Sequence, residues 1–472
     1  MGVLAHVDSE NFDCSTHLKY LTSRVVMKYR GGSVKTTACL TFLFLFLLVT
    51  LSTLRNSTKH PDGSPASSDS TGSQKQRASV IYEITDVRTV SGHIEAITCN
   101  SSNLDYDLCT IGSQTLLDPT TATFFAVGST SSALVKTRPY PRKRDKRALS
   151  DVREITLSSS PPDSTCGVTH ASPALVFSTG GYTGNFFHDF NDGLIPLFIT
   201  VNSLFPDHDV VLVISDFEDW WAQKYKDLLP HFTRHRIVNM EREISNHCFP
   251  SAIVGLIKHG HMKMDPPKTL VDFSAFLEQV YKPVDSTLTQ KVKSTRPRLV
   301  LVNRRGDVGR LILNLEQVKN AAMDVGFEVL TFEPNRENSL AESFRLIHGS
   351  HAMMGVHGAG LTHLLFLRPG SVLLQVVPIS TDWLSQTYFE DPAREIGLEY
   401  INYKITANES SLSKIYGPDD LVVKDPEAYT RGDFSKMKIY LKTQNVEIDL
   451  VRFQRYLEEA YGKAKILFDK EG

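Results

Sequence analysis

The chain has 472 residues, 41% of them hydrophobic and 22% charged, which is enough folded material for two or three domains. Its 51 basic and 53 acidic residues nearly cancel. The balance excludes a chain-wide positive field that would collect nucleic acid, so any site for a polyanion has to be local.

The N-terminal region predicts a membrane anchor behind a short cytosolic tail, residues 1–35. Residues 36–54 carry no charge, and a helix of that length, rising about 1.5 Å per residue, crosses a hydrocarbon core of about 30 Å. Basic residues are more numerous before this segment than after it, which favours a lumenal remainder. A cleaved signal peptide is the alternative, but the apolar segment starts late and lacks a small-x-small cleavage site.

The segment after the anchor, residues 55–79, is polar and rich in Ser, Gly and Pro, which is typical of a flexible stem. Asn-x-Ser/Thr sequons, which are candidate glycosylation sites in a secretory lumen, begin at Asn56, Asn100 and Asn408. Folded sequence starts near residue 80 with short β-rich segments.

Four cysteines follow the anchor, and an even set in a lumenal chain favours disulfides. They are Cys99, Cys109, Cys166 and Cys248. We expect the first two to close a short loop, which leaves the last two to pair. Buried free thiols are the alternative.

Residues 136–147, KTRPYPRKRDKR, form a basic run with Asp145 as its one acidic residue. Such a run could bind an acidic partner. A solvated loop or a processing site is the interpretation we favour.

Two series of alternating strands and helices follow. Residues 173–214 read as strand, glycine-rich turn, amphipathic helix, loop and strand, which is a β-α-β unit. From residue 298 to residue 378 strands and helices alternate at short spacing, which favours a parallel sheet covered on both faces.

The sequence therefore predicts an α/β protein with two Rossmann-like domains facing a cleft. Residues 80–290 form the N-terminal domain, 296–385 the C-terminal domain, and 386–472 an extension that ends in a helix. Loops at the carboxyl ends of the strands should line the cleft.

The turn GVHGAGLTHL follows one predicted strand and opens a helix. Its central residues, where glycines and a helix N-terminus favour a phosphate, are His357, Gly358, Ala359 and Gly360. The turn is not a GxGxxG fingerprint, and Gln375 stands where a nicotinamide enzyme would place an acidic residue, so that class fits poorly. His363, further along the helix, is interpreted as a packing or supporting residue.

A second candidate element ends the strand RLVLV. Arginine forks bind phosphate oxygens in bidentate fashion, and several of them at a strand's carboxyl end would face the same cleft as His357. The residues are Asn303, Arg304, Arg305 and Arg310. A surface arginine cluster on a loop is the alternative.

The third element, GGYTGNFFHDFNDG, covers residues 180–193 at the turn of the first β-α-β unit. Polar side chains crowd this otherwise aromatic helix; they are Asn185, His188, Asp189, Asn191 and Asp192. His188 or Asp189 could take a proton from an acceptor hydroxyl. Helix capping by the carboxylates and a buried histidine hydrogen bond are the alternative.

We predict no metal site. Asp105 and Asp107, like Asp207 and Asp209, match Asp-x-Asp, but neither pair follows a strand as a metal-bearing pair should. Asp216 and Glu218 are better placed but are also suited to starting a helix. No zinc-type spacing of His and Cys is present.

Taken together, GGYTGNFFHDFNDG, VNRRG with the later Arg310, and GVHGAGLTHLLFLRPGSVLLQVVP closely resemble plant glycosyltransferase family 61, in the same order and from about residue 80 to the C-terminus. The resemblance implies a GT-B fold and an inverting reaction that depends on a nucleotide sugar and needs no metal or other cofactor. It also implies a single-pass type II protein of the Golgi membrane.

The resemblance assigns roles to the same residues. Arg304, Arg305 and the turn from His357 would hold the donor diphosphate, and His188 or Asp189 would deprotonate the acceptor. The nearest likeness is to the xylan-decorating clade, which implies a UDP-pentose donor and xylan or xylo-oligosaccharide as acceptor, with possible partners among other Golgi glycosyltransferases.

Several activities remain open within this resemblance. We expect β-1,2-xylosyl transfer from UDP-xylose, with α-1,3-arabinosyl transfer from UDP-arabinofuranose as the first alternative. Transfer of β-1,2-xylose to the N-glycan core, or an inert Golgi subunit that organises partner synthases, are further alternatives.

Overall fold

The computed structural model describes residues 96–129, 132–161, 163, 165–282, 294–306 and 308–471. The predicted tail, anchor and stem, together with Asn56, lie outside these residues. Within the described ranges, no helix combines the length and the apolar character that a membrane crossing requires.

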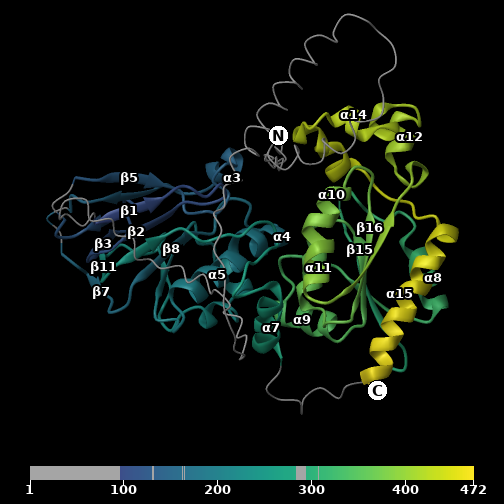
Figure 1. Ribbon diagram of the computed structural model, residues 1–472, viewed down its shortest axis with the longest axis horizontal. Helices are drawn as coiled ribbons and strands as arrows, with labels where there is room; N and C mark the ends of the chain where they lie inside the picture. Colours follow the sequence, from purple (N-terminus) through teal and green to yellow (C-terminus); the bar gives the residue numbers. More distant parts are fainter. Residues whose placement is uncertain are drawn as a thin grey trace, which may run out of the picture. The chain divides into compact units, whose positions relative to one another are not determined.

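The described chain is a mixed α/β protein with three sheets, as predicted for its class (Figure 1). The first sheet has the order β1-β2-β12-β8-β9-β10, in which β12, β8, β9 and β10 run parallel and β1 and β2 are antiparallel additions. Its strands are β1 (Ile97–Asn100), β2 (Leu108–Ile111), β12 (Ala252–Val254), β8 (Ala174–Ser178), β9 (Val211–Ser215) and β10 (Val238–Asn239).

The second sheet is mixed and has the order β5-β6-β4-β3-β11-β7, in which the β6–β4 and β11–β7 pairs are parallel and the others antiparallel. Its strands are β5 (Leu134–Thr137), β6 (Ile155–Ser158), β4 (Thr123–Ala126), β3 (Thr115–Asp118), β11 (His247–Phe249) and β7 (Val168–Thr169). Phe124 and Leu157 from this sheet share a buried core with Val176 and Val213 from the first, so the two sheets pack against each other through apolar faces.

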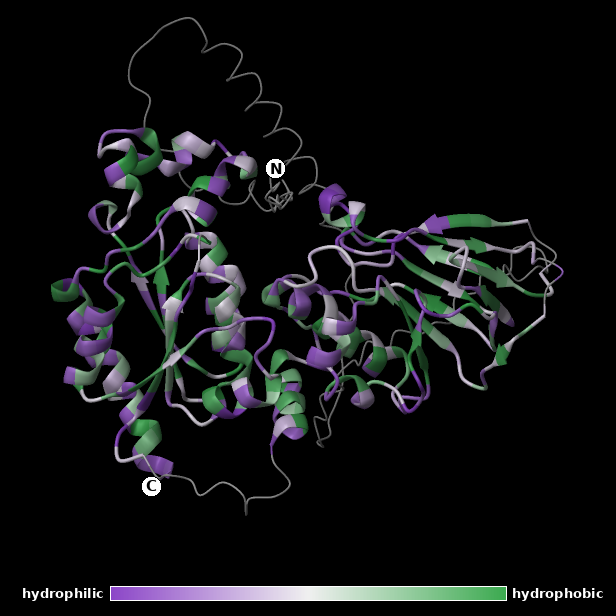
Figure 2. Ribbon diagram, turned by 180° about the vertical axis from the view of Figure 1, so that it is seen from behind, coloured by the Kyte–Doolittle hydropathy of each residue, from purple (hydrophilic) through white to green (hydrophobic). Residues whose placement is uncertain are grey.

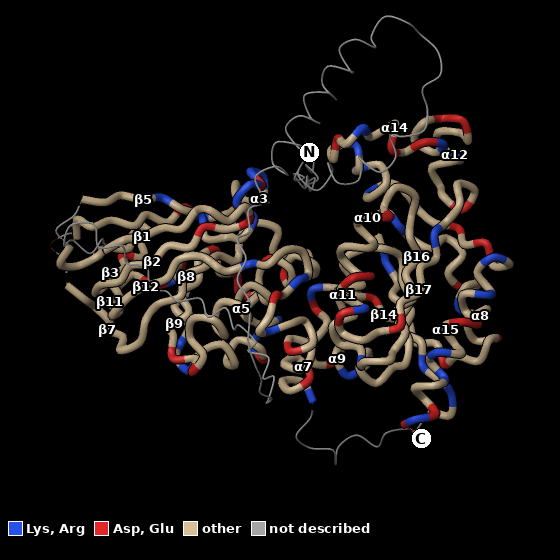
Figure 3. The backbone as a smooth tube through the Cα atoms, viewed as in Figure 1, with Lys and Arg blue, Asp and Glu red and all other residues tan. Residues whose placement is uncertain are grey.

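The third sheet is entirely parallel, in the order β14-β13-β15-β16-β17. Its strands are β14 (Glu328–Phe332), β13 (Arg298–Val302), β15 (Ala352–Val356), β16 (Val372–Val377) and β17 (Glu399–Lys404). β15 and β16 contain no charged residue and are buried throughout, as expected of central strands covered on both faces. Figure 3 shows these strands in tan, with the charges on the surrounding elements.

Helices cover both faces of this third sheet (Figure 1). α8 (Leu315–Val325) and the terminal α15 (Leu450–Glu471) pack on one face, and α9 (Leu340–His348), α10 (Asp382–Ser385) and α11 (Asp391–Glu395) lie on the other. Figure 2 shows hydrophobic and hydrophilic residues alternating along these helices, which is the pattern of a helix with one buried side. The strands and helices predicted between residues 298 and 378 and the terminal helix are confirmed.

The helices of the N-terminal half surround the predicted β-α-β unit. They are α3 (Lys146–Ser150), α4 (Phe186–His188), η1 (Asp189–Leu194), α5 (Ile195–Leu204), α6 (Asp219–Lys224), η2 (Leu229–His231) and α7 (Leu270–Tyr281). The remaining helical segments are η3 (Ala359–Phe366), η4 (Gln386–Glu390), η5 (Ala407–Glu409), α12 (Leu412–Tyr416), α13 (Leu421–Lys424), α14 (Pro426–Thr430), η6 (Phe434–Met437) and η7 (Ile439–Thr443).

One aromatic core joins the two halves of the chain. The ring of Phe190 in η1 lies 6.2 Å from that of Phe273 in α7 and 6.3 Å from that of Phe366 in η3, all between centroids. These residues belong to a single buried cluster. The glycine-rich motif of the N-terminal half is therefore packed directly against the C-terminal half.

Both predicted disulfides are present, Cys99 with Cys109 and Cys166 with Cys248. The first joins the paired strands β1 and β2. The second ties the segment before β7 to β11, across a separation of 82 residues. The alternative of buried free thiols is wrong for these four cysteines.

Candidate functional site

The carboxyl ends of β13 and β15 bring two predicted elements together, because neighbouring parallel strands end at the same edge of a sheet. Gly358 marks the meeting point. A Cβ built on this glycine would lie 2.5 Å from one terminal nitrogen of Arg304 and 3.3 Å from one of Arg310. Only a residue without a side chain allows both guanidinium groups to approach the backbone so closely.

We call Arg304, Arg310 and His357 the C-terminal cluster. Arg310 donates from Nη1 to the carbonyl oxygen of His357 at 3.1 Å, and Arg304 donates from Nε to that of Gly309 at 3.2 Å. Burial lowers the pKa of Arg304. Among the residues that the structure describes, no carboxylate forms an ion pair with Arg304, so its charge is held by carbonyl dipoles and suits an anion.

His357 is buried, and its ring is oriented by two side chains. The amide nitrogen of Gln375 lies 3.0 Å from Nδ1 and the hydroxyl of Ser385 3.1 Å from it, and Tyr400 donates to the amide oxygen of Gln375 at 2.8 Å. Burial and the nearby arginines hold the pKa of His357 well below its usual range, so the ring is neutral. An amide nitrogen can only donate, which places the ring proton on Nε2.

The neighbouring predicted residues are directed elsewhere. Arg305 is exposed and pairs with Glu333 at 2.7 Å, and Asn303 donates to the same carboxylate at 2.8 Å. Both side chains therefore contact Glu333, whereas Arg304, which is adjacent to Arg305 in the sequence, contacts the carbonyl oxygen of Gly309.

The rest of the turn forms η3, a 3₁₀ helix that opens with Ala359 and Gly360. His363 donates from Nδ1 to the carbonyl oxygen of Gly360 at 2.8 Å and stacks on Phe186, with 4.0 Å between ring centroids. Burial lowers the pKa of His363 to about 3. The ring of His363 packs between Phe186 of the N-terminal half and Phe332 of the C-terminal half.

The motif of residues 180–193 places its polar groups through a break in helix geometry. Asn185 caps α4 by accepting from the backbone of Phe187 at 3.1 Å. The chain then continues as η1, a π helix. π turns are rare and frequent at functional sites. Here the wider turn directs Asp189 and Asp192 to different partners.

Asp189 is held within its own half. One carboxylate oxygen accepts from the backbone N–H of Gly184 at 2.8 Å and the other from the hydroxyl of Tyr225 at 2.7 Å. Burial raises the pKa of Asp189 to about 6. The carboxylate connects the glycine-rich turn, η1 and the segment after α6.

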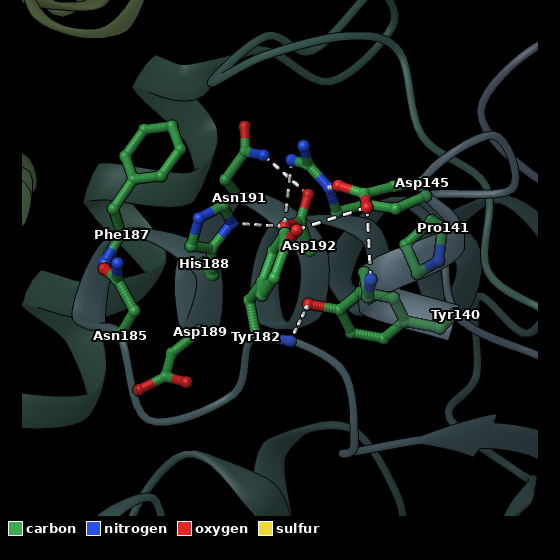
Figure 4. A network of polar contacts seen from close by, with 12 residues as sticks. Tyr140, Pro141, Asp145, Tyr182, Asn185, Phe187, His188, Asp189, Asn191 and Asp192 are labelled. Atoms are coloured by element: carbon green, nitrogen blue, oxygen red, sulfur yellow. Dashed lines mark hydrogen bonds and ion pairs between the residues drawn. The ribbon is translucent and has the colours of Figure 1, made fainter. Parts of the chain in front are cut away.

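Asp192 lies at the centre of a buried group that we call the N-terminal cluster; Figure 4 labels His188, Asn191, Asp192 and Asp145 among its members. Its carboxylate binds His188 Nδ1 at 2.6 Å, Lys258 Nζ at 2.6 Å and Asn191 Nδ2 at 2.6 Å. Arg142 Nη1 lies 3.5 Å from it. The members of the cluster are His188, Asn191, Asp192, Arg142, Asp145 and Lys258.

Arg142 and Asp145 come from the basic run, so the predicted solvated loop is wrong at these positions. Their exposed fractions are 8% and 4%, and they pair with each other at 3.2 Å. Tyr182 donates from its hydroxyl to Asp145 at 3.1 Å. Burial of the arginine is possible because two carboxylates, those of Asp145 and Asp192, compensate its charge.

Sequence reasoning missed Arg142, Asp145 and Lys258 as cluster members. The one signal available was Asp145 standing alone within a run of cations, since a lone carboxylate three residues after an arginine can pair with it. Nothing marked Lys258, which reaches the cluster from the segment after β12.

Aromatic contacts connect the two clusters. Phe187 lies beside His188, with 5.3 Å between ring centroids, and 6.2 Å from Phe389 of η4. Phe389 in turn lies 5.2 Å from His357. The polar groups of the two halves are therefore near neighbours across one layer of aromatic side chains.

The Asp-x-Asp pairs have ordinary partners. Asp107 binds Lys143 at 2.7 Å, and Asp209 binds Ser172 and His235. Asp216 accepts from Ser178 and from the backbone of Arg153. In the described part of the chain, no group of three or more His, Cys, Asp and Glu side chains could hold a metal ion. The asparagines of the sequons at Asn100 and Asn408 are exposed, whereas Ser410 of the second sequon is buried.

Comparison with known proteins places this site within a recognised family model. Residues 184–374 match the model for glycosyltransferase 61, and this range includes the members of both clusters except Arg142 and Asp145. The chain is 36% identical over 399 residues to a xylan glycosyltransferase of Arabidopsis thaliana, covering 78% of this chain and 80% of that protein.

Two relatives from Oryza sativa subsp. japonica are named for different activities. An alpha-1,3-arabinosyltransferase is 34% identical over 374 residues, covering 77% of this chain and 64% of that protein. A beta-1,2-xylosyltransferase is 36% identical over 340 residues, covering 69% of this chain and 71% of that protein.

Proposed function

The chain belongs to glycosyltransferase family 61 and is thus a glycosyltransferase that uses a nucleotide-sugar donor; from this premise we propose that it transfers a pentose from a UDP-sugar to xylan. The relatives named above act on xylan or transfer xylose or arabinose, which supports this substrate class. We favour β-1,2-xylosyl transfer from UDP-xylose, with α-1,3-arabinosyl transfer from UDP-arabinofuranose as the alternative.

The observation that carries the proposal is the convergence of Arg304 and Arg310 on Gly358. A UDP leaving group gains negative charge on its diphosphate as the glycosidic bond to the sugar breaks. Two guanidinium groups fixed beside a backbone that carries no side chain match that charge and need no reorganisation during the reaction. The N–H on Nε2 of His357 adds a neutral donor.

This arrangement supports a reaction that requires no divalent metal, because the arginines supply positive charge to the diphosphate. An inverting transfer is a direct displacement at the anomeric carbon by the acceptor hydroxyl. It needs a base opposite the leaving group, and His188 and Asp189 are the candidates in the other half of the chain. We propose that the two halves are the two domains of a GT-B enzyme, with residues 80–290 on the acceptor side.

We propose a Golgi location with single-pass type II topology. Support comes from the uncharged segment of residues 36–54 and from the two disulfides, which persist in oxidising compartments. A complex with other Golgi glycosyltransferases would place successive acceptor modifications together.

The test is a transfer assay with purified protein, xylo-oligosaccharide and either UDP-xylose or UDP-arabinofuranose, with the product linkage determined by NMR. We expect a pentosylated product with one donor and undiminished activity in EDTA. Absence of product with both donors contradicts the proposal, and loss of activity in EDTA contradicts its metal-independent form.

A matched pair of variants connects the assay to the site. Arg304→Ala should weaken UDP binding, measured by calorimetry, whereas Arg455→Ala on the exposed side of α15 should leave it unchanged. If Arg304→Ala folds and keeps full activity, the donor site is misplaced.

A further inference from the structure

Asp192 holds one ring nitrogen of His188 in a fixed chemical state. Both side chains are buried, and the carboxylate contacts Nδ1 at 2.6 Å. Lys258 and Arg142 keep the pKa of Asp192 well below its usual range despite burial, so the carboxylate is ionised and can only accept. Nδ1 therefore carries the proton, and the basic lone pair of the neutral ring is on Nε2, on the side away from Asp192 in Figure 4.

The charges of the N-terminal cluster cancel when His188 is neutral. Arg142 and Lys258 contribute two positive charges, and Asp145 and Asp192 two negative charges. The cluster thus places an ionised carboxylate against Nδ1 of His188 and two cations against that carboxylate. A carboxylate on one ring nitrogen orients the other nitrogen for proton transfer, as a general base requires.

Asp189 lacks this arrangement. Each of its oxygens already accepts a hydrogen bond, from Gly184 and from Tyr225, and both partners belong to the same half of the chain. Its role is to fix the glycine-rich turn against the helix. His188 instead lies beside Phe187, whose ring faces Tyr388 and Phe389 of the other half.

We infer that His188 is the general base of the transfer and that Asp192, held by Lys258 and Arg142, is its positioning residue; the inference rests on the proposed function. The acceptor O–H bond breaks, and its proton moves to Nε2 of His188. The acceptor oxygen forms a bond to the anomeric carbon. The bond from that carbon to the diphosphate oxygen breaks, and the electron pair leaves with UDP.

The groups around His188 come from four segments. Asp189 and Asp192 lie on η1, which directly follows His188. Arg142 and Tyr140 lie on the segment after β5, Tyr182 on the glycine-rich turn, and Lys258 and His261 on the segment after β12. The ring of Tyr182 lies 4.8 Å from that of His188. Burial, together with Lys258 and Arg142, lowers the pKa of His261 to about 3, so His261 adds no positive charge at neutral pH.

The experiment measures the pH profile of kcat/KM for two charge variants. Asp192→Asn removes the negative charge beside His188, disfavours the imidazolium and should shift the acid limb to lower pH. Lys258→Met removes a positive charge and should shift the same limb to higher pH. Each shift should be about one pH unit, and kcat should fall in Asp192→Asn.

Surface substitutions of the same kind serve as matched controls. Asp469→Asn and Lys465→Met alter an exposed pair on α15 and should leave the profile unchanged. Arg142→Met is the second cation variant if Lys258→Met does not fold. His188→Gln should lower kcat by about 10² to 10⁴, with a smaller effect on KM, and Asp189→Asn should cost less than tenfold.

The outcomes separate this inference from the proposed function. Absence of pentosyl transfer by the wild-type protein contradicts the function itself. If the wild-type protein transfers pentose but the acid limb shifts in the same direction in Asp192→Asn and Lys258→Met, the base assignment alone is overturned. A larger loss of kcat in Asp189→Asn than in His188→Gln overturns it as well. ¹⁵N NMR of histidine-labelled protein, compared with His188→Gln, gives a readout besides activity: a proton on Nε2 rather than Nδ1 of His188 at neutral pH contradicts the inference.

Discussion

The N-terminal and C-terminal clusters are both buried and both contain a histidine, yet they are built in opposite ways. Around Asp192 the positive charges are matched by carboxylates at 2.6 to 3.5 Å. Around Gly358 the hydrogen bonds of Arg304 and Arg310 reported above go to carbonyl oxygens. One cluster is complete without a ligand, and the other is arranged for an anion. The difference separates a site that handles a proton from one that binds a diphosphate.

Among substitutions outside the N-terminal cluster, the largest expected effect comes from removing charge at the C-terminal cluster. Arg304→Ala should lower kcat/KM by about 10² to 10³, because a cation that stabilises charge in the transition state is lost. Stability should change little, since no ion pair is broken. Steady-state kinetics with thermal unfolding as the folding control check this. A loss of less than tenfold would contradict a role for Arg304 in stabilising the leaving diphosphate.

Asp189 lies three residues from Asp192 but outside the N-terminal cluster. Because the pKa of Asp189 is raised and that of Asp192 is lowered, their contributions to stability should change with pH in opposite senses. Burial raises the pKa of Asp189 from the ordinary value of an aspartate to about 6. The folded protein therefore binds a proton that the unfolded chain has lost, and this contribution to stability disappears as pH rises through about 6.

Asp189→Asn should remove this pH-dependent loss. The difference in free energy of unfolding between the variant and wild type should be about 1–3 kcal/mol more favourable to the variant at pH 7.5 than at pH 4.5. Urea unfolding at the two pH values measures the difference. A gain that is equal at both values would show that Asp189 is ionised in the folded state throughout this range.

The close approach at Gly358 gives a third comparison. In Gly358→Ala the new methyl group meets the guanidinium of Arg304, so KM for the donor should rise about tenfold as the cation is displaced. Gly462→Ala on α15 is the control, because its Cβ would meet nothing within 4 Å, and alanine should stabilise that helix by about 0.5–1 kcal/mol. Unchanged donor KM in Gly358→Ala would remove the turn from the binding site.

The smallest effect is expected at Arg305, the neighbour of Arg304. Its exposed ion pair with Glu333 is worth about 0–1 kcal/mol, so Arg305→Ala should change kcat/KM less than fivefold. Steady-state kinetics of Arg304→Ala and Arg305→Ala in one assay measure the difference between the two arginines. Equal losses would place both arginines on the donor.

The sequence predicted the parallel sheet well because its strands are apolar runs separated by helices with one apolar side. The meeting of Arg304, Arg310 and His357 also followed from the rule that parallel strands end at one edge. The π helix could not be predicted, since a period of 3.6 places Asp189 and Asp192 on the same side. Lys258 was missed because it reaches Asp192 only through tertiary packing across 66 residues.

The positions of the disulfides have a consequence for the order of synthesis. All the paired cysteines precede residue 249, and no cysteine follows it. The half that contains the N-terminal cluster leaves the ribosome first and requires oxidation, whereas the half that contains Arg304 and His357 requires none. In a reducing host we therefore expect misfolding to begin in the first half, which cannot form its disulfides. The second half needs no disulfide, and its folding is affected only because the first half does not supply the surface on which it packs.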